Sequence, residues 1–432
     1  MGIFICRTNV VHIIIFLLSL LSSDIGFTRR GNATLGINYG QIGDNLPQPS
    51  QVLGLLSSLK ITKVRIYDTN PQILTSFANT GIDLIVTIEN EILHVLVDPQ
   101  EALQWVTTHI KPYFPATRIS GIAVGNEIFS MDDKTLISNV VPAMVSIHQA
   151  LVQLGLDTYM HVSTANSAAV LSNSYPPSAG SFEDELSGVM KQLLQFLYTT
   201  RAPFWINAYP YFAYKDAPTK IPLDYVLFNP NPGMVDPYTK LHYDNMLYAQ
   251  VDAVIFAIAR MGFGGLEVKV SETGWPSKGD QDEVGATTEN AQIYNRNLLR
   301  RQMANEGTPL RPSQKLDVYL FALFNEDMKP GPTSERNYGL YEPDGTMTYN
   351  VGITTLASTT TPTSTSTTPA SSSSTSSPTA TTSSTAITPA TTSASISLTS
   401  SATHQASRKG YQSTGSWIFL LLIFQVLHRR LV

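Results

Sequence analysis

Cysteine is almost missing from this chain of 432 residues, because Cys6 is the only one. A single thiol excludes a disulfide-stapled binding module and a metal site built from several thiolates. Basic blocks are also missing from the central part of the chain, and the net charge is −5. We therefore expect no nucleic-acid partner, no metal and no other cofactor. Stability must therefore come from a large hydrophobic core. We also expect the protein to be a monomer.

The N-terminus has the layout of a secretory signal peptide. Arg7 precedes the apolar run Val10 to Leu21, and the small residues Ser22 and Ser23 follow it. The run is too short for a comfortable membrane span, and no A-x-A pattern fixes the cleavage point. We assign residues 1–26 to the signal peptide and residues 27–356 to one folded domain. Asn32 begins the only N-x-S/T sequon and is a predicted N-glycosylation site.

The C-terminal part changes composition abruptly. Residues 357–407 are almost entirely Ser, Thr, Ala and Pro, which predicts a disordered and O-glycosylated stalk. Residues 408–432 contain a polar spacer and the apolar run Trp417 to Leu427. This pattern predicts a glycosylphosphatidylinositol (GPI) attachment signal that is removed on maturation, with Ser401 as the attachment residue.

A tail-anchored transmembrane helix is the alternative for this end, and His428-Arg429-Arg430 favours it. However, a span needs about twenty apolar residues, and this run is shorter. We therefore expect the protein to follow the secretory pathway. It would be held on the extracellular, cell-wall face of the plasma membrane by a GPI anchor.

Between Leu35 and about Thr355, short β-rich runs end in polar residues and are usually followed by helical spacing. Val52, Leu55, Leu56 and Leu59 show such spacing before the second run. The runs are 35–39, 63–68, 84–90, 119–127, 160–166, 204–209, 268–272 and 318–326. Eight strand–helix units over roughly 320 residues predict an α/β fold of the (β/α)8 TIM-barrel type. A doubly wound sheet is the alternative, but no G-x-G-x-x-G follows the first run.

Polar residues at the strand ends would crowd one opening of such a barrel, because its active face is built at the C-terminal ends of the strands. The pattern predicts a cleft with hydrogen-bonding groups for sugar hydroxyls and aromatic rings for sugar C–H faces. The strand-end residues are Asn38, Tyr39, Asp68, Glu89, Asn126, Glu127, Asn166, Asn207, Tyr209, Glu272 and Glu326.

Two glutamates stand out, because Glu127 and Glu272 each end an apolar run. A carboxylate at such a position costs several kcal/mol of desolvation unless it is used or paired. Two carboxylates on one rim suit glycosidic bond cleavage, one as proton donor and one as nucleophile or base. The alternative is a structural ion pair of either glutamate with a cation such as Lys329 or Arg65.

Several motifs together resemble the plant β-1,3-glucanases of glycoside hydrolase family 17. They are Gly36-Ile37-Asn38-Tyr39-Gly40, Val64-Arg65-Ile66-Tyr67-Asp68, Val124-Gly125-Asn126-Glu127, Ser271-Glu272-Thr273-Gly274-Trp275-Pro276, and the segment from Leu323 through Lys329 to Leu340. The resemblance implies a (β/α)8 barrel and retaining hydrolysis of internal β-1,3-glucosidic bonds, with callose as a natural substrate.

The resemblance also implies roles for individual residues. Glu127 matches the acid/base and Glu272 the nucleophile, while Glu326, Lys329 and Glu335 match a supporting cluster near the nucleophile. The predicted substrate contacts are Tyr39, Asn126, Asn207, Tyr209, Phe212, Trp275 and Phe324. Since this chain lacks a cysteine-rich carbohydrate-binding module, we expect the cleft alone to supply glucan affinity.

Two alternative functions stay open. A β-1,3-glucanosyltransferase would use the same intermediate with a sugar acceptor, and a non-catalytic glucan-binding wall protein would need no intermediate. A preference for mixed-linkage glucan is also compatible with these motifs.

Overall fold

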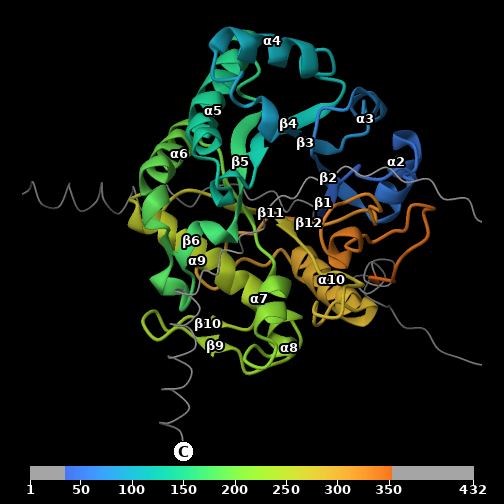
Figure 1. Cartoon of the computed structure of the whole chain (residues 1–432), viewed down its shortest axis with the longest axis vertical. Coiled ribbons are helices and arrows are strands. Elements are labelled where there is room, and N and C mark those ends of the chain that lie inside the picture. The colour runs from blue at the N-terminus through green and yellow to red at the C-terminus, as the bar shows by residue number, and fades with distance from the viewer. Residues whose placement is uncertain (1–34, 353–432) are drawn as a thin grey trace, which may run out of the picture. The chain divides into compact units, whose positions relative to one another are not determined.

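The computed structural model describes residues 35–352. Eight parallel strands form a closed barrel in the order β1-β12-β11-β8-β5-β4-β3-β2 (Figure 1). Their bounds are β1 Leu35–Tyr39, β2 Ile61–Ile66, β3 Asp83–Ile88, β4 Arg118–Asn126, β5 His161–Ser167, β8 Phe204–Asn207, β11 Val268–Thr273 and β12 Val318–Leu320. The barrel closes where β1 pairs with β12, with Ile37 opposite Leu320. The predicted (β/α)8 fold and all eight predicted strands are confirmed.

Helices surround the barrel, and the longer ones connect consecutive strands (Figure 1). Their bounds are α2 Pro49–Ser58, α3 Pro71–Ser76, α4 Pro99–His109, α5 Lys134–Leu154, α6 Ser187–Thr200, α7 Pro210–Asp216, α8 Leu223–Val226, α9 Met246–Arg260 and α10 Thr288–Met303. The expected helical segment before the second barrel strand corresponds to α2. Side chains cap several helix starts; Asp133, for example, accepts from the backbone N–H groups of Thr135 and Leu136 at the start of α5.

Two small hairpins lie outside the barrel. One pairs β6 (Leu171–Asn173) with β7 (Ser181–Phe182), and the other pairs β9 (Met234–Val235) with β10 (His242–Tyr243). The second hairpin, together with α7 and α8, occupies the long insertion between β8 and α9. Pairing of two-residue strands carries too little periodicity to be read from the sequence.

The core has two layers, because successive residues of a strand point to opposite faces. On β3, Leu84 and Val86 belong to the large cluster between strands and helices, whereas Ile85 belongs to a separate cluster inside the barrel. That inner cluster also contains Ala123, Trp205 and Tyr319. The filled interior leaves the ends of the strands as the place for a site.

Helix α5 is long and apolar enough to cross a membrane by length and composition alone, among the described residues. Its apolar side packs on the barrel, where Met144, Ile147 and Leu151 have no exposed surface. Only 44% of its most apolar window is buried, so part of this helix leaves apolar side chains on the outer surface.

Candidate active site

Glu272 lies near the C-terminal end of β11 with only 6% of its surface exposed. Three side chains donate to its carboxylate: Arg65 Nη1 at 2.7 Å and Tyr67 Oη at 2.8 Å to Oε1, and Tyr209 Oη at 2.8 Å to Oε2. A charged donor and two hydroxyls suit a negatively charged oxygen and fix its orientation. The donors come from β2 and from the end of β8, so barrel closure assembles the site.

The two tyrosines remain hydrogen-bond donors at any ordinary pH. Burial, followed by the charge on Glu272, raises the pKa of Tyr67 and of Tyr209 well above the usual value. Arg65 is fully buried, and Glu272 is its ion-pair partner. The ion pair between Glu272 and Arg65, which the sequence offered as a structural alternative, is therefore present. It is one contact within a larger polar network.

Glu127 directly follows β4 and has a left-handed backbone conformation with φ of +54°. Such a conformation is uncommon for a residue other than glycine and is tolerated where the surroundings hold it. Gly125, two residues before it, also has a positive φ, of +74°. The backbone N–H of Glu127 donates to the Ala165 carbonyl at 2.8 Å, which fixes this turn to β5.

Burial raises the pKa of the Glu127 carboxyl to about 7, with the charge on Glu272 as the second cause. A hydrogen bond from Asn207 Nδ2 to Glu127 Oε1, at 2.9 Å, partly lowers this pKa. Glu127 can therefore hold a proton in weakly acidic solution. A carboxyl of this kind is suited to general acid catalysis.

A chain of amide contacts connects the two glutamates. Arg65 Nη2 donates to Asn126 Oδ1 at 2.7 Å, while its Nη1 binds Glu272. Asn207 donates to Glu127 and accepts from Ser271 Oγ at 2.7 Å. The structure thus brings together five of the predicted site residues in one network of contacts, namely Glu127, Glu272, Asn126, Asn207 and Tyr209.

The predicted supporting cluster lies beside this network. Glu326 is 3% exposed and accepts from the backbone N–H of Ile42 at 2.8 Å, and burial raises the pKa of its carboxyl. Lys329 pairs with Glu335 at 3.3 Å and lies 4.3 Å from the centroid of the Phe321 ring. Among the described residues, the ion pair of Glu272 is therefore with Arg65, and that of Lys329 is with Glu335.

The aromatic residues divide into two groups. Tyr209 packs against Phe212, and Phe212 is 37% exposed, so both can form a cleft wall. Tyr39, Trp275 and Phe324, which were also predicted to contact substrate, are between 0% and 2% exposed and are packed into the barrel end in this structure. The indole of Trp275 donates to the Gly285 carbonyl at 2.8 Å, which places its ring behind the wall.

Two asparagines at strand ends also have structural roles. Asn38 Nδ2 donates to the carbonyl of Ser271 at 3.1 Å, and Asn166 Nδ2 donates to that of Trp205 at 2.9 Å. Both asparagines are at most 1% exposed. They connect barrel strands instead of presenting amides to a ligand.

Sequence reasoning did not identify Arg65 and Tyr67 as site residues. The available signal was the position of Arg65 between Val64 and Ile66 in an otherwise apolar strand. A buried cation needs a buried anion, and Glu272 was a candidate partner.

No group of three or more His, Cys, Asp or Glu side chains suited to a metal occurs within residues 35–352. Asn32 and Ser401, and the segments assigned to the signal peptide, stalk and anchor signal, lie outside the described residues.

Comparison with known proteins agrees with this geometry. Glucan endo-1,3-beta-glucosidase 11 of Arabidopsis thaliana is 52% identical over 338 residues, covering 78% of this chain and 79% of the relative. Glucan endo-1,3-beta-glucosidase 14 of the same plant is 53% identical over 320 residues, covering 74% and 82%.

Solved structures give the same picture. A β-1,3-glucanase and allergen of Cryptomeria japonica pollen superposes with a TM-score of 0.71 at 42% identity, covering 74% of this chain and 99% of that one. One of two plant β-glucan endohydrolases described as having distinct substrate specificities gives a TM-score of 0.68 at 36% identity, covering 73% and 99%. The model of glycosyl hydrolases family 17 matches residues 35–353. The chain belongs to this family.

Proposed function

We propose that this protein hydrolyses internal β-1,3-glucosidic bonds of a β-1,3-glucan such as callose, with retention of configuration. Relatives more than 50% identical are named glucan endo-1,3-beta-glucosidases, which supports the substrate. The observation that carries the proposal is the contrast between the two glutamates. Glu272 is held by three hydrogen-bond donors, whereas burial raises the pKa of Glu127 to about 7.

In the first step, a Glu272 oxygen attacks the anomeric carbon and forms a glycosyl ester. Glu127 gives its proton to the departing glycosidic oxygen, so the bond electrons leave on a neutral hydroxyl. Arg65 accepts no proton in this step, but it orients both Glu272 and Asn126. Since Arg65 occupies the amide oxygen of Asn126, the Asn126 NH₂ group can donate to the sugar 2-hydroxyl.

In the second step, water attacks the anomeric carbon and its proton passes to Glu127, while Glu272 leaves as a carboxylate. Ester formation removes the charge on Glu272, which is the second cause of the raised pKa of Glu127. The pKa of Glu127 therefore falls in the intermediate, and the residue can act as a base.

Proton NMR during early hydrolysis tests the mechanism. A retaining enzyme releases the β-anomer first, whereas an initial α-anomer would show an inverting reaction and a different role for Glu272. Azide gives a second test of the roles. We expect a β-glycosyl azide from Glu127→Ala and an α-glycosyl azide from Glu272→Ala. The same anomer from both variants would contradict the assignment.

Sizing the products from laminarin separates the alternative functions. Shorter oligosaccharides indicate hydrolysis, longer ones indicate glucanosyl transfer, and unchanged laminarin indicates a binding protein. Parallel digestion of a mixed-linkage β-1,3;1,4-glucan measures linkage preference. The test is needed because the plant β-glucan endohydrolases described above are reported to have distinct substrate specificities.

The location of the protein is a separate part of the proposal. The apolar run Trp417 to Leu427 and the Ser/Thr-rich segment before it support a GPI anchor on the outer face of the plasma membrane. Phosphatidylinositol-specific phospholipase C should then release the protein from membranes. Truncation before Ser400 should give a secreted and fully active protein, and loss of activity would show that the removed segment supports the barrel.

A further inference from the structure

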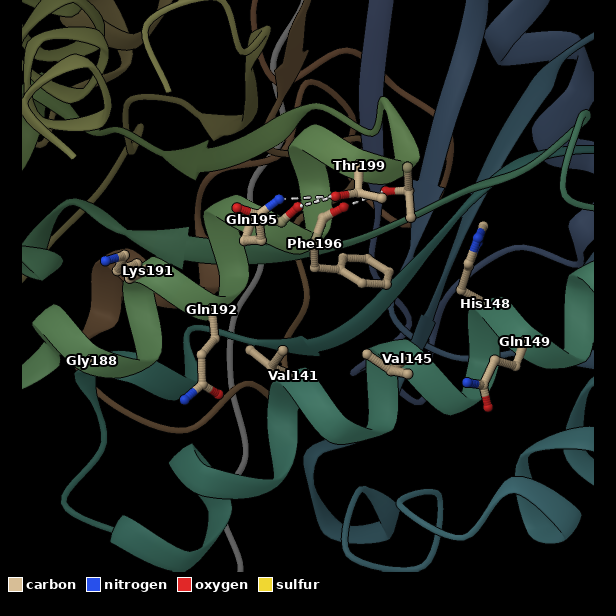
Figure 2. Close-up of a pocket in the computed structure, with 11 residues that line it drawn as sticks. Val141, Val145, His148, Gln149, Gly188, Lys191, Gln192, Gln195, Phe196 and Thr199 are labelled. Atoms are coloured by element: carbon tan, nitrogen blue, oxygen red, sulfur yellow. Dashed lines mark hydrogen bonds between the residues drawn. The ribbon is translucent and has the colours of Figure 1, made fainter. Parts of the chain in front are cut away.

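A groove of about 730 Å³ lies between α5 and α6 (Figure 2). Neither Glu127 nor Glu272 is among the residues that line it. The half-buried ring of Phe196 extends from α6 into the space between the helices, facing Val145 and His148 of α5 (Figure 2). His148 packs edge-on against this ring, with centroids 5.8 Å apart. Val145 is 37% exposed, so the groove has an apolar wall that is open to solvent.

Polar but mostly uncharged side chains surround this apolar wall. Gln149 and Gln192 are exposed, and neither side-chain amide forms a hydrogen bond to another residue in the 35–352 region. Lys191 is the one lysine or arginine among the residues that line the groove, and none of those lining residues carries a carboxylate. An anionic or strongly cationic ligand therefore finds little charge complementarity here, whereas a neutral ligand with many hydroxyls finds free amides beside apolar carbon.

We infer that this groove is a second, non-catalytic binding site for a neutral β-glucan chain. The ligand class rests on the proposed function, because the polymer cleaved at the strand ends is the one that this surface would meet. Apolar and aromatic carbon suits the C–H faces of glucose, and the amides suit its hydroxyls. The groove volume is within the usual range of about 300–1,000 Å³ for small-ligand sites.

The position of the groove relative to the cleft favours the same polymer. Helix α5 begins at Lys134, seven residues after Glu127, and α6 follows β5, the strand to which the Glu127 backbone is bonded. In this fold, helices begin on the face where the strands end. The end of the groove near Val141 and Gly188 is therefore turned toward the catalytic face, which favours the polymer that the catalytic cleft binds.

Equilibrium dialysis with laminarihexaose tests the inference in a Glu272→Ala background, which prevents turnover. We expect two binding sites per protein. The double substitution Gln149→Ala and Gln192→Ala should weaken the second site about fivefold, on the scale of a lost hydrogen bond. Phe196→Ala should remove the second site, with a thermal melt to check its folding. Gln153→Ala is the matched control, because Gln153 is exposed on α5 outside the groove.

The active enzyme gives an independent readout. The double glutamine variant should hydrolyse insoluble β-1,3-glucan more slowly at low substrate, while kcat/KM for a soluble short laminari-oligosaccharide stays unchanged. A single binding site in the Glu272→Ala background, or two sites that the groove substitutions leave intact, would overturn the inference. Failure of the proposed function looks different, because the unsubstituted enzyme would then leave soluble laminari-oligosaccharides uncleaved.

Discussion

Arg65 and Glu272 form a buried ion pair, with Nη1 2.7 Å from Oε1 and side chains 0% and 8% exposed. The two residues are 207 positions apart in the sequence. Because the second guanidinium nitrogen binds Asn126, Arg65 sets the position of both the proposed nucleophile and the residue before the proposed acid. One buried cation thus connects barrel stability with catalysis.

Replacing this cation should damage both properties. Arg65→Met leaves Glu272 buried without its charge partner, and breaking such a pair costs about 3–5 kcal/mol. We expect this loss in the free energy of unfolding by urea, together with near-complete loss of kcat. Arg118→Met is the matched control, because its pair with Asp83 is largely exposed (59% and 31%). It should cost at most about 1 kcal/mol. Equal losses in the two variants would contradict a special role for Arg65.

The two tyrosine hydroxyls on Glu272 allow a finer test. Tyr67→Phe and Tyr209→Phe each remove one donor to the carboxylate, and a hydrogen bond to a charged group is worth about 1.5–3 kcal/mol. We expect kcat to fall roughly ten- to hundredfold in each variant if the donor acts during catalysis.

Tyr338→Phe provides the control for these substitutions. Tyr338 packs against Tyr209, but its buried hydroxyl has no hydrogen-bond partner in the described region. The kcat of the Tyr338→Phe variant should therefore change less than twofold, which corresponds to a change of less than about RT ln 2 in the activation free energy. A loss in Tyr338→Phe equal to that in Tyr209→Phe would point to packing as the cause.

The barrel itself was predictable because its signal is repeated. Apolar runs such as Leu84 to Ile88 are buried on both faces, as parallel strands under helices should be. The last strand was predicted too long, since β12 ends at Leu320 and not at Glu326. After Leu320 the regular strand pairing stops, although Leu323 N–H still donates to the Asn38 carbonyl of β1. That contact depends on a strand 280 or so residues earlier, so no local pattern reveals where the strand ends.

The site was predictable only in part, because sequence position does not decide which way a side chain points. The two glutamates followed from carboxylates placed after apolar strands. Trp275 lies three residues beyond Glu272 in the same motif, yet it is completely buried against Tyr211 and Tyr294. The partnership of Arg65 with Glu272 arises from closure of the sheet, in which β1 and β12 lie between their strands.

Glycine at position 40 has a steric reason that can be tested. A Cβ atom there would clash with the Glu326 carboxylate. Gly40→Ala must displace Glu326 and its bond to the Ile42 N–H, so we expect destabilisation of about 1–3 kcal/mol and lower activity.

Gly54→Ala on α2 is the control, because nothing lies within 4 Å of its added Cβ. It should stabilise the protein by about 0.5–1 kcal/mol, because alanine favours a helix. Destabilisation by both substitutions would contradict the steric explanation.

The raised pKa of Glu127 predicts how activity depends on pH. Glu127 must be protonated to act as the acid, so kcat/KM should fall as pH rises through about 7. With an activated aryl β-glycoside, the leaving group needs little protonation. Glu127→Gln should then lose this alkaline limb. An unchanged limb would point to another proton donor, and Glu326 is a candidate because burial also raises its pKa.

The same pKa predicts a change in stability. Because folding raises the pKa of Glu127 from 4.5 to about 7, the native state holds this proton more tightly than the unfolded state. The contribution of Glu127 to the free energy of unfolding is therefore greatest below pH 4.5 and is lost as pH rises through about 7. One pKa unit corresponds to about 1.4 kcal/mol, so we expect Glu127→Gln to reduce the loss between pH 4.5 and 8 by roughly 1–3 kcal/mol. The exposed Glu101→Gln is the control and should leave the pH dependence unchanged. If Glu127→Gln and Glu101→Gln gave the same stability curve, folding would not raise the pKa of Glu127.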